Sequence, residues 1–318
     1  MKKAENQSAL ADAERAARER PNDPAALEAL GFAYFDVEQY AEAKVALERA
    51  IELNPESAPA YEKIGHIHYR IGSPPQLAID AYERAIAIDP HFDNPYYGLG
   101  ILHATKTGQY DQAIEAFKRG LTANPGDPFL TASLGTTYAR MGKIEEAIAI
   151  LEQVIKLHPD EAFAQDWLSL LYLHQKRFDK AIASCRRELE IGENSESHRL
   201  LGYIYDAQGL NDRAVAELER AVELAPRDYE ARAALAKVYR KAGNLPAAEQ
   251  HYNTALEAAL QDDEYGQSCF YAVSGDVEKA LTLLEIGCAK GQVQPGWVRI
   301  DPEFAFIQDE PRFQALLD

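Results

Sequence analysis

The pattern of apolar positions repeats along the chain. In each repeat a small residue is followed three positions later by an aromatic residue or a histidine, and the small residues are spaced 33 to 35 residues apart. The pairs are Gly31 with Tyr34, Gly65 with His68, Gly100 with His103, Gly135 with Tyr138, Ser169 with Tyr172, Gly202 with Tyr205 and Ala236 with Tyr239. A fixed period of this length indicates a solenoid, in which one helical unit stacks repeatedly on its neighbours.

The spacing inside each repeat predicts a hairpin of two helices. Leu27, Leu30, Gly31 and Tyr34 recur at the interval of one helix face, and a second periodic stretch begins near Ala43. In the second periodic stretch of each repeat, an alanine is followed four residues later by a residue that is usually bulky. These pairs are Ala43 with Leu47, Ala78 with Tyr82, Ala113 with Phe117, Ala147 with Leu151, Ala181 with Cys185, Ala214 with Leu218 and Ala248 with Tyr252. We expect the small residues to let paired helices approach closely.

Prolines punctuate the array, because a proline cannot continue the interior of a helix. Most repeats end at such a residue: Asn54-Pro55, Asp89-Pro90, Asn124-Pro125, His158-Pro159 and Ala225-Pro226. Two repeats contain one extra residue, near Ser73-Pro74-Pro75 and near Gly108-Gln109. The repeat that begins near Ala162 ends at Ile191-Gly192-Glu193 without a proline.

Together, the order of small, aromatic, alanine, bulky and proline positions resembles the tetratricopeptide repeat. The resemblance implies an all-α, right-handed α-α superhelix of about seven hairpins. The expected organisation is an N-terminal half-repeat at 1–23, repeats at 24–57, 58–92, 93–127, 128–161, 162–194, 195–228 and 229–260, and a C-terminal capping hairpin and tail at 261–318.

The last segment resembles the terminal motif that follows some bacterial tetratricopeptide arrays, which implies a bacterial origin. A solenoid must cover its last apolar face, and Trp297, Phe304, Phe306 and Phe313 are suitable for that purpose. The same residues could instead form a docking surface. We expect the capping role, since terminal repeats are generally atypical for this reason.

The resemblance also implies that the first helices line a concave groove. Its expected contact residues are Phe32, Phe35, His66, Tyr69, Tyr97, Ile101, Phe129, Thr136, Arg140, Phe163, Leu170, His174, Arg199 and Tyr203. Any single ring could instead complete the packing between adjacent repeats. As a set, the rings favour a docking site for an extended segment or an amphipathic helix of a partner protein.

A more specific function of the family, capture of a chaperone's C-terminal carboxylate, needs lysine, arginine and asparagine at particular groove positions. The early repeats carry Glu28, Phe32, Glu62 and His66 there, so we predict that this clamp is absent. A later basic group, formed by Lys237, Arg240 and Lys241, is interpreted either as a solvated helix face or as an attraction for an acidic tail.

Composition limits the classes of binding partner and the cellular compartment that we expect for this chain. The chain has 33 lysines and arginines against 51 aspartates and glutamates, a formal net charge of −18, which argues against nucleic acid and membrane surfaces. No apolar signal segment is present near the N-terminus, and no run approaches ~18 apolar residues. The odd set Cys185, Cys269 and Cys288 lacks metal or redox spacing. A soluble protein of the cytoplasm is expected.

No motif for chemistry stands out. His66 and His68 are two residues apart and would point about 200° apart on a helix, so they cannot share a metal. Phosphate loops, GxSxG and HExxH are missing from the sequence. We therefore predict no catalytic residues, cofactor or metal, and a non-catalytic adaptor or scaffold that binds protein. The alternative is a regulatory or assembly subunit that acts through its convex face or its ends. An enzyme is the least favoured function, and the pattern leaves homo-oligomerisation open.

Overall fold

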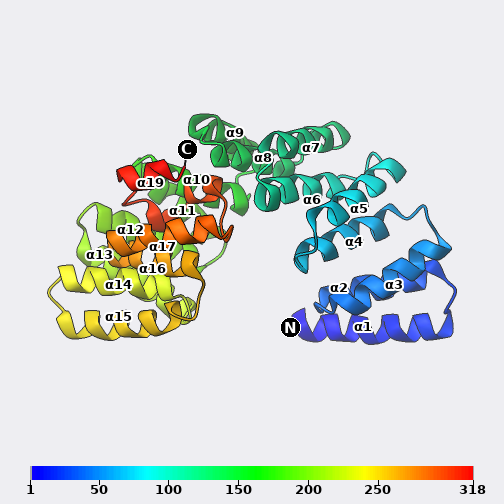
Figure 1. Ribbon diagram of the computed structural model, residues 1–318, viewed down its shortest axis with the longest axis horizontal. Coiled ribbons are helices and arrows are strands. Elements are labelled where there is room, and N and C mark those ends of the chain that lie inside the picture. The colour runs from blue at the N-terminus through cyan, green and yellow to red at the C-terminus, as the bar shows by residue number, and fades with distance from the viewer. Residues whose placement is uncertain (1, 318) are drawn as a thin grey trace. The chain divides into compact units, whose positions relative to one another are not determined.

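In the computed structural model, which describes residues 2–317, the chain is built of helices with no strand in that range (Figure 1). The helices are α1 (Lys2–Glu19), α2 (Pro24–Asp36), α3 (Tyr40–Leu53), α4 (Ala58–Arg70), α5 (Pro75–Ile88), α6 (Asn94–Leu102) with the π-helix η1 (His103–Thr107), α7 (Tyr110–Ala123), α8 (Pro128–Arg140), α9 (Ile144–Leu157), α10 (Ala162–His174), α11 (Phe178–Ile191), α12 (Ser195–Ala207), α13 (Asn211–Leu224), α14 (Tyr229–Lys241), α15 (Leu245–Ala259), α16 (Glu264–Ser274), α17 (Val277–Ala289), α18 (Pro295–Val298), the 3₁₀-helix η2 (Pro302–Phe304) and α19 (Pro311–Ala315). The predicted all-α fold of helical hairpins is confirmed.

The chain divides into two compact units, Met1–Ser133 and Leu134–Asp318, and the boundary lies inside α8. Unit 1 contains α1 and the hairpins α2–α3, α4–α5 and α6–α7. Unit 2 contains the hairpins from α9 onward and ends in a C-terminal segment, which we define as residues 295–317. The repeat boundaries proposed from the sequence stay predictions.

Close contact between a small and a bulky residue holds each hairpin together. Gly65 of α4 lies against the ring of Tyr82 of α5, and a methyl group at Gly65 would come within 2.6 Å of that ring. Tyr82 is 1% exposed and is also covered by Gly98 of α6. The same contact recurs between Gly31 and Leu47, Gly100 and Phe117, Gly135 and Leu151, and Gly202 and Leu218. The predicted small and bulky series therefore meet as the two helices of one hairpin.

Side-chain caps begin several of the first helices. Asp23 accepts a hydrogen bond from the Ala25 amide at the start of α2, and Ser57 accepts one from Ala60 at the start of α4. At the boundary without a proline, Asn194 accepts from the Ser197 amide at 2.8 Å and starts α12. This boundary therefore keeps the N-terminal cap that other first helices have, although it lacks the proline.

The extra residue expected near Gly108-Gln109 is accommodated inside a helix and not in the turn. Residues His103–Thr107 form one π turn, and the Gln109 amide donates to the His103 carbonyl at 3.0 Å. A π turn accepts one additional residue without ending the helix. The first helix of this repeat therefore continues through η1 to Gly108.

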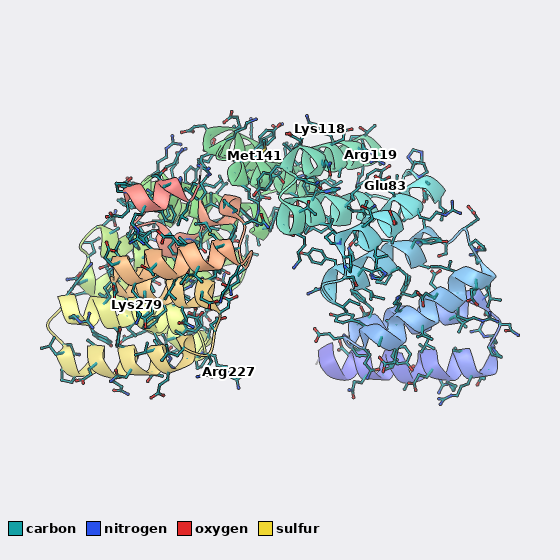
Figure 2. The ribbon with its side chains drawn as sticks, in the orientation of Figure 1. Glu83, Lys118, Arg119, Met141, Arg227 and Lys279 are labelled. Carbon is teal, nitrogen blue, oxygen red and sulfur yellow. The ribbon has the colours of Figure 1, made fainter. Side chains whose placement is uncertain are left out.

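Charged pairs connect second helices on their outer side. Arg119 of α7 forms two hydrogen bonds to Glu83 of α5, at 2.9 and 3.1 Å, and the two side chains lie beside each other (Figure 2). Both side chains are about two-fifths exposed, so we expect the pair to contribute at most ~1 kcal/mol.

The turns between paired helices use a left-handed residue, usually glycine, as at Gly72 with φ of 66°. Glu38 has φ of 63° at the equivalent turn of the first hairpin. We expect Gly72→Ala to lower the free energy of unfolding by about 1 kcal/mol, because L-residues are strained in this conformation. Nothing lies within 4 Å of a Cβ at Gly72, so no clash would contribute.

Glu38→Gly is the matched reverse substitution, and we expect it to raise the same quantity by up to about 1 kcal/mol. Urea denaturation of both variants measures the effect. Equal loss of stability in the two would show that backbone strain does not govern these turns.

Candidate functional site

In unit 1, aromatic side chains of the first helices lie on one face, which we call the unit 1 face and define by Phe32, Phe35, His66, Tyr69, Tyr97 and Phe129. At its start the ammonium of Lys63 lies 4.7 Å from the ring centroid of Phe35 and 5.6 Å from that of Phe32. The Phe35 and His66 rings are 6.3 Å apart. These contacts join α2 to α4 through a cation on aromatic rings.

Further along the unit 1 face, Tyr69 of α4 contacts the π turn. Its hydroxyl lies 3.2 Å from Thr105 Oγ1, and Lys106 lies over its ring at 5.2 Å. Tyr97 of α6 and Phe129 of α8 meet edge to face at 5.5 Å, and Phe129 is 43% exposed. Ile101 is half-buried on the same helix as Tyr97. The predicted rings of this half are thus brought together across successive hairpins.

A cavity of about 340 Å³ opens on the unit 1 face between α4, α6 and the start of α8. Its walls combine rings and carboxylates, and its lining residues are Glu62, Lys63, His66, Asp93, Asn94, Tyr97, Asp127, Phe129 and Leu130. The volume lies within the range of small ligand pockets. Asp93 and Asp127 were not among the contact residues expected from the sequence, and Glu62 was considered there only as a groove position that lacks a clamp cation.

Burial shifts the pKa values of two side chains that line this cavity, Glu62 and His66. Glu62 is 3% exposed, and burial raises the pKa of its carboxyl while Lys63 opposes that change. Burial, with Lys63 and Arg70, lowers the pKa of His66 to about 4. His66 is therefore neutral near pH 7, and its Nδ1 lies 3.4 Å from Glu62 Oε1. The cavity consequently presents carboxylates and a neutral imidazole beside apolar rings.

In unit 2, the corresponding face is covered by the C-terminal segment, which is drawn in orange and red against the green helices (Figure 1). Trp297 packs on Trp167 of α10 with centroids 6.0 Å apart, and the Arg140 guanidinium lies 4.9 Å from the Trp297 ring. Glu303 forms an ion pair with Arg199 of α12. Phe306 lies 6.1 Å from the Tyr203 ring, with Lys237 of α14 over it at 4.6 Å.

Two polar contacts extend this cover toward the end of α10. Gln308 Nε2 donates to the His174 carbonyl at 3.1 Å, and Lys176 pairs with Asp309 at 2.9 Å. The sequence-predicted contacts Arg140, His174, Arg199 and Tyr203 therefore touch the chain's own C-terminal segment. Phe163 packs on Trp167 at 6.2 Å, and Leu170 and Thr136 are buried at 5% and 4% exposure.

The position of this segment differs from the expected cap over the last repeat. Phe304 and Phe313 are each 1% exposed, and Phe304 packs on Tyr265 of α16, as a cap would. Trp297 and Phe306, however, also contact Trp167 of α10 and Tyr203 of α12, which belong to earlier repeats. The segment thus lies over the first helices of several repeats, because its aromatic and acidic side chains match rings and cations there.

The basic group Lys237, Arg240 and Lys241 is largely paired within unit 2. Lys237 lies 3.1 Å from Asp206, Lys241 also pairs with Asp206, and Arg240 lies over the Tyr252 ring at 5.7 Å. Lys237 also lies over the Phe306 ring of the C-terminal segment, so it contacts that segment through an aromatic ring and not through a carboxylate. The common partner of the two lysines is an aspartate on the neighbouring first helix.

Neither a metal site nor a membrane span is indicated in the part of the chain that the structure describes. No group of three or more histidine, cysteine or carboxylate side chains in residues 2–317 is placed to hold a metal ion. Within the same range, every helix is too short or too polar to span a bilayer. Cys185 and Cys269 are buried, and burial raises the pKa of both thiols.

Asp301 of the C-terminal segment is buried at 4% exposure, and Asp166 of α10 and Glu230 of α14 are half-buried. Burial raises the pKa of Asp166 to about 7, with smaller contributions from Glu196 and Glu188 and opposition from Arg199. Burial likewise raises the pKa of Glu230 to about 7 and that of Asp301 to about 6. Among the described residues, Asp166 Oδ1 has no hydrogen-bond partner. Ionisation of these groups therefore opposes folding of unit 2.

The sign of the pH dependence follows from these raised values. Between about pH 4 and pH 7 the folded state holds more protons than the unfolded state, so stability falls as pH rises. We expect Asp166→Asn to flatten this slope and to raise the free energy of unfolding at pH 8 by on the order of 2 kcal/mol. Both tryptophans, Trp167 and Trp297, lie in unit 2, so their fluorescence during urea unfolding at pH 5, 6.5 and 8 measures it.

The control is Asp179→Asn, at an exposed carboxylate on α11, which we expect to leave the slope unchanged. An identical slope in the wild type and Asp166→Asn would contradict the assignment.

Comparisons with known proteins find family models and a relative that this chain is similar to. A family model described as "Cilia and flagella-associated protein 70 C-terminal domain" matches residues 57–270, and a model described as "TPR repeat" matches residues 33–72. A curated cattle protein (Bos taurus), "BBSome complex member BBS4", is 26% identical over 168 residues, which are 50% of this chain and 31% of that protein. This chain matches about a third of that relative's length.

Solved structures share the fold. The Cut9–Hcn1 hetero-tetramer of the APC/C matches with a TM-score of 0.63 at 20% identity, covering 74% of this chain and 47% of that one. Yeast Tom70 matches with a TM-score of 0.63 at 17% identity, covering 96% and 62%. PilW, a type IV pilus biogenesis factor, matches with a TM-score of 0.57 at 16% identity, covering 64% and 94%. The predicted tetratricopeptide repeats are confirmed.

Proposed function

Because the chain belongs to the family of the cilia and flagella-associated protein 70 C-terminal domain, a family of helical repeats, we propose that it is a non-catalytic adaptor or scaffold that binds an apolar or helical segment of a partner protein on the unit 1 face. Tetratricopeptide proteins generally mediate protein-protein interaction. The observation that carries the proposal is the row of rings from Phe32 to Phe129 with a cavity among them.

The chemistry of this face favours a polypeptide that offers apolar side chains. Phe129 is substantially exposed, and Tyr97 packs against it, so an inserted side chain would contact both rings. Large aromatic residues around a pocket commonly dominate the free energy of binding between proteins. The two units also differ, because the equivalent face of unit 2 is covered by the C-terminal segment.

Replacing both Tyr97 and Phe129 with alanine should weaken partner binding by about 2 kcal/mol or more if these rings dominate the interaction. Partners are first captured from the native cell and identified by mass spectrometry, and calorimetry with the purified partner then gives the affinity. Both substitutions lie on the face and not in the Gly65–Tyr82 contact, so the hairpins should remain folded. Unchanged affinity in a folded double variant would contradict binding at the unit 1 face.

A second candidate function is that of an assembly subunit acting through an end of the array. A largely apolar cavity of about 490 Å³ lies on α2 and α3, and Val45 on its wall is 69% exposed. Its lining residues are Leu27, Leu30, Tyr34, Ala41, Glu42, Val45, Ala46 and Arg49. The relative named as a BBSome complex member is, by its name, part of an assembly, which supports this alternative.

One matched variant separates the two functions. Val45→Asp places a charge on the wall of the α2–α3 cavity and should leave binding at the unit 1 face unchanged. If Val45→Asp abolishes the complex while the Tyr97 and Phe129 double variant retains it, the assembly function replaces the first proposal.

The compartment and the excluded partners remain proposals. We propose a cytoplasmic protein that does not bind nucleic acid, on the strength of its net charge of −18. The bacterial origin expected from the terminal motif is not confirmed, and the family that the chain belongs to is described for a cilia and flagella-associated protein.

A further inference from the structure

The C-terminal segment is held at one side by the last hairpin. Arg312 of α19 pairs with Glu285 at 2.9 Å and with Glu278 at 2.8 Å, both on α17. Phe313 packs on Phe304 at 5.7 Å, and Phe304 reaches Tyr265 of α16. These contacts attach the segment to the hairpin that precedes it; release of residues 297–309 would break the Phe304 contact and leave those of Arg312.

At its other side the same segment contacts helices that lie about a hundred residues earlier. Glu303 pairs with Arg199, whose side chain is 13% exposed, and Phe306, 37% exposed, meets Tyr203. Asp309 and Lys176 are 82% and 56% exposed. The contacts of Phe306 and Asp309 are therefore polar or partly open to solvent, as at the rim of a bound peptide, whereas Val298, Ile300 and Ile307 of the same segment are buried at 0 to 4% exposure.

Opposite charges face each other where the C-terminal segment contacts these helices. On a chain of net charge −18, α8, α12, α14 and the turn after α10 present Arg140, Arg199, Lys237 and Lys176 to the segment. Arg199 also lies 3.5 Å from Asp228, and Lys237 lies 3.1 Å from Asp206. The segment supplies the complementary carboxylates Glu303 and Asp309 and the rings Trp297 and Phe306. An acidic segment with interspersed aromatic residues therefore fits this face in charge and in shape.

We propose that residues 297–309 are an intramolecular ligand of unit 2: they close a peptide-binding face on α10, α12 and α14, and an acidic, aromatic-containing segment of a partner protein binds that face when they leave it. Arg199 receives the carboxylate, Tyr203 and Lys237 hold an aromatic ring, and Lys176 receives a second carboxylate. The partner's segment is expected to have the spacing of the chain's own segment. There the aromatic residue Phe306 follows the first carboxylate, Glu303, by three residues, and the second carboxylate, Asp309, follows it by six. The proposal does not depend on binding at the unit 1 face.

The probe is a labelled synthetic peptide of residues 297–309, added to the full-length protein. In the variant Glu303→Gln with Phe306→Ala, the protein's own segment is weakened, whereas the peptide and the face keep their native residues. We expect this variant to bind the peptide at least tenfold more tightly than the wild type does. Fluorescence anisotropy of the peptide gives the affinity.

Two further variants locate the site. Glu310→Gln changes the same charge at an exposed position of the segment, and we expect it to bind the peptide as weakly as the wild type. Arg199→Met, introduced into the weakened variant, should remove the gained affinity. A folded weakened variant that binds the peptide no better than the wild type would overturn the proposal.

Tryptophan fluorescence provides a second readout, because Trp167 and Trp297 are the two tryptophans of the chain and contact each other. Release of the segment should shift the emission of the weakened variant to longer wavelength while its helical circular dichroism is retained. Unshifted emission in that variant would count against release.

Hydrogen exchange of the wild type tests whether the segment is released, even if the variants do not fold. The amides of Phe304 and Ile307 donate to carbonyls within the segment, at 3.1 and 3.0 Å, so they are protected while it is docked. We expect them to exchange at least tenfold faster than the interior amides of α12 and α14. Equal protection would show that the segment leaves only when unit 2 unfolds, and the proposal would fail.

Discussion

The contact between a small residue of each first helix and a large residue of the second fixes the geometry of both units. A methyl group at Gly65 would come within 2.6 Å of the Tyr82 ring, and one at Gly31 within 2.5 Å of Leu47, so the hairpins depend on the missing side chain. Because this contact sets the rotation of each first helix, the positions beside it project to a common face. The binding surfaces follow from that constraint.

The two units use the same face differently. In unit 1 the face carries rings, a neutral histidine and carboxylates around a cavity. In unit 2 cations and rings are covered by the chain's own C-terminal segment. The difference lies in side chains that packing within the hairpin leaves unconstrained, such as Glu62 in α4 and Arg199 in α12. A repeated backbone can therefore present faces of unlike chemistry.

The sequence alone predicts the hairpins well, because their contacts recur at a constant period. The pairing of Gly100 with Phe117 could be read from two coincident series of residues. The π turn at His103–Thr107 could not, since an extra residue near a turn has the same pattern whether the helix or the loop accommodates it. The structure is therefore needed to show where a repeat of unusual length accommodates its extra residue.

The candidate site was harder to predict than the fold. The rings of unit 1 were found by their position in the repeat, whereas Asp93 and Asp127 precede first helices, at a recurring position whose residues are explained by helix capping. The pairing of Glu303 with Arg199 joins positions about a hundred residues apart outside any repeat. The aromatic residues of the last segment predicted a cap, but only the three-dimensional arrangement showed that Trp297 and Phe306 lie over earlier helices.

The central claim is that the unit 1 face is open to a partner while the unit 2 face is occupied from within. Site-specific photo-crosslinking tests it directly, with p-benzoylphenylalanine placed at Tyr69 in one protein and at Tyr203 in another. The account predicts crosslinks from position 69 to the partner protein, and from position 203 to residues 297–309 of the same chain. Partner crosslinks from position 203 in the resting protein, with none from position 69, would contradict it.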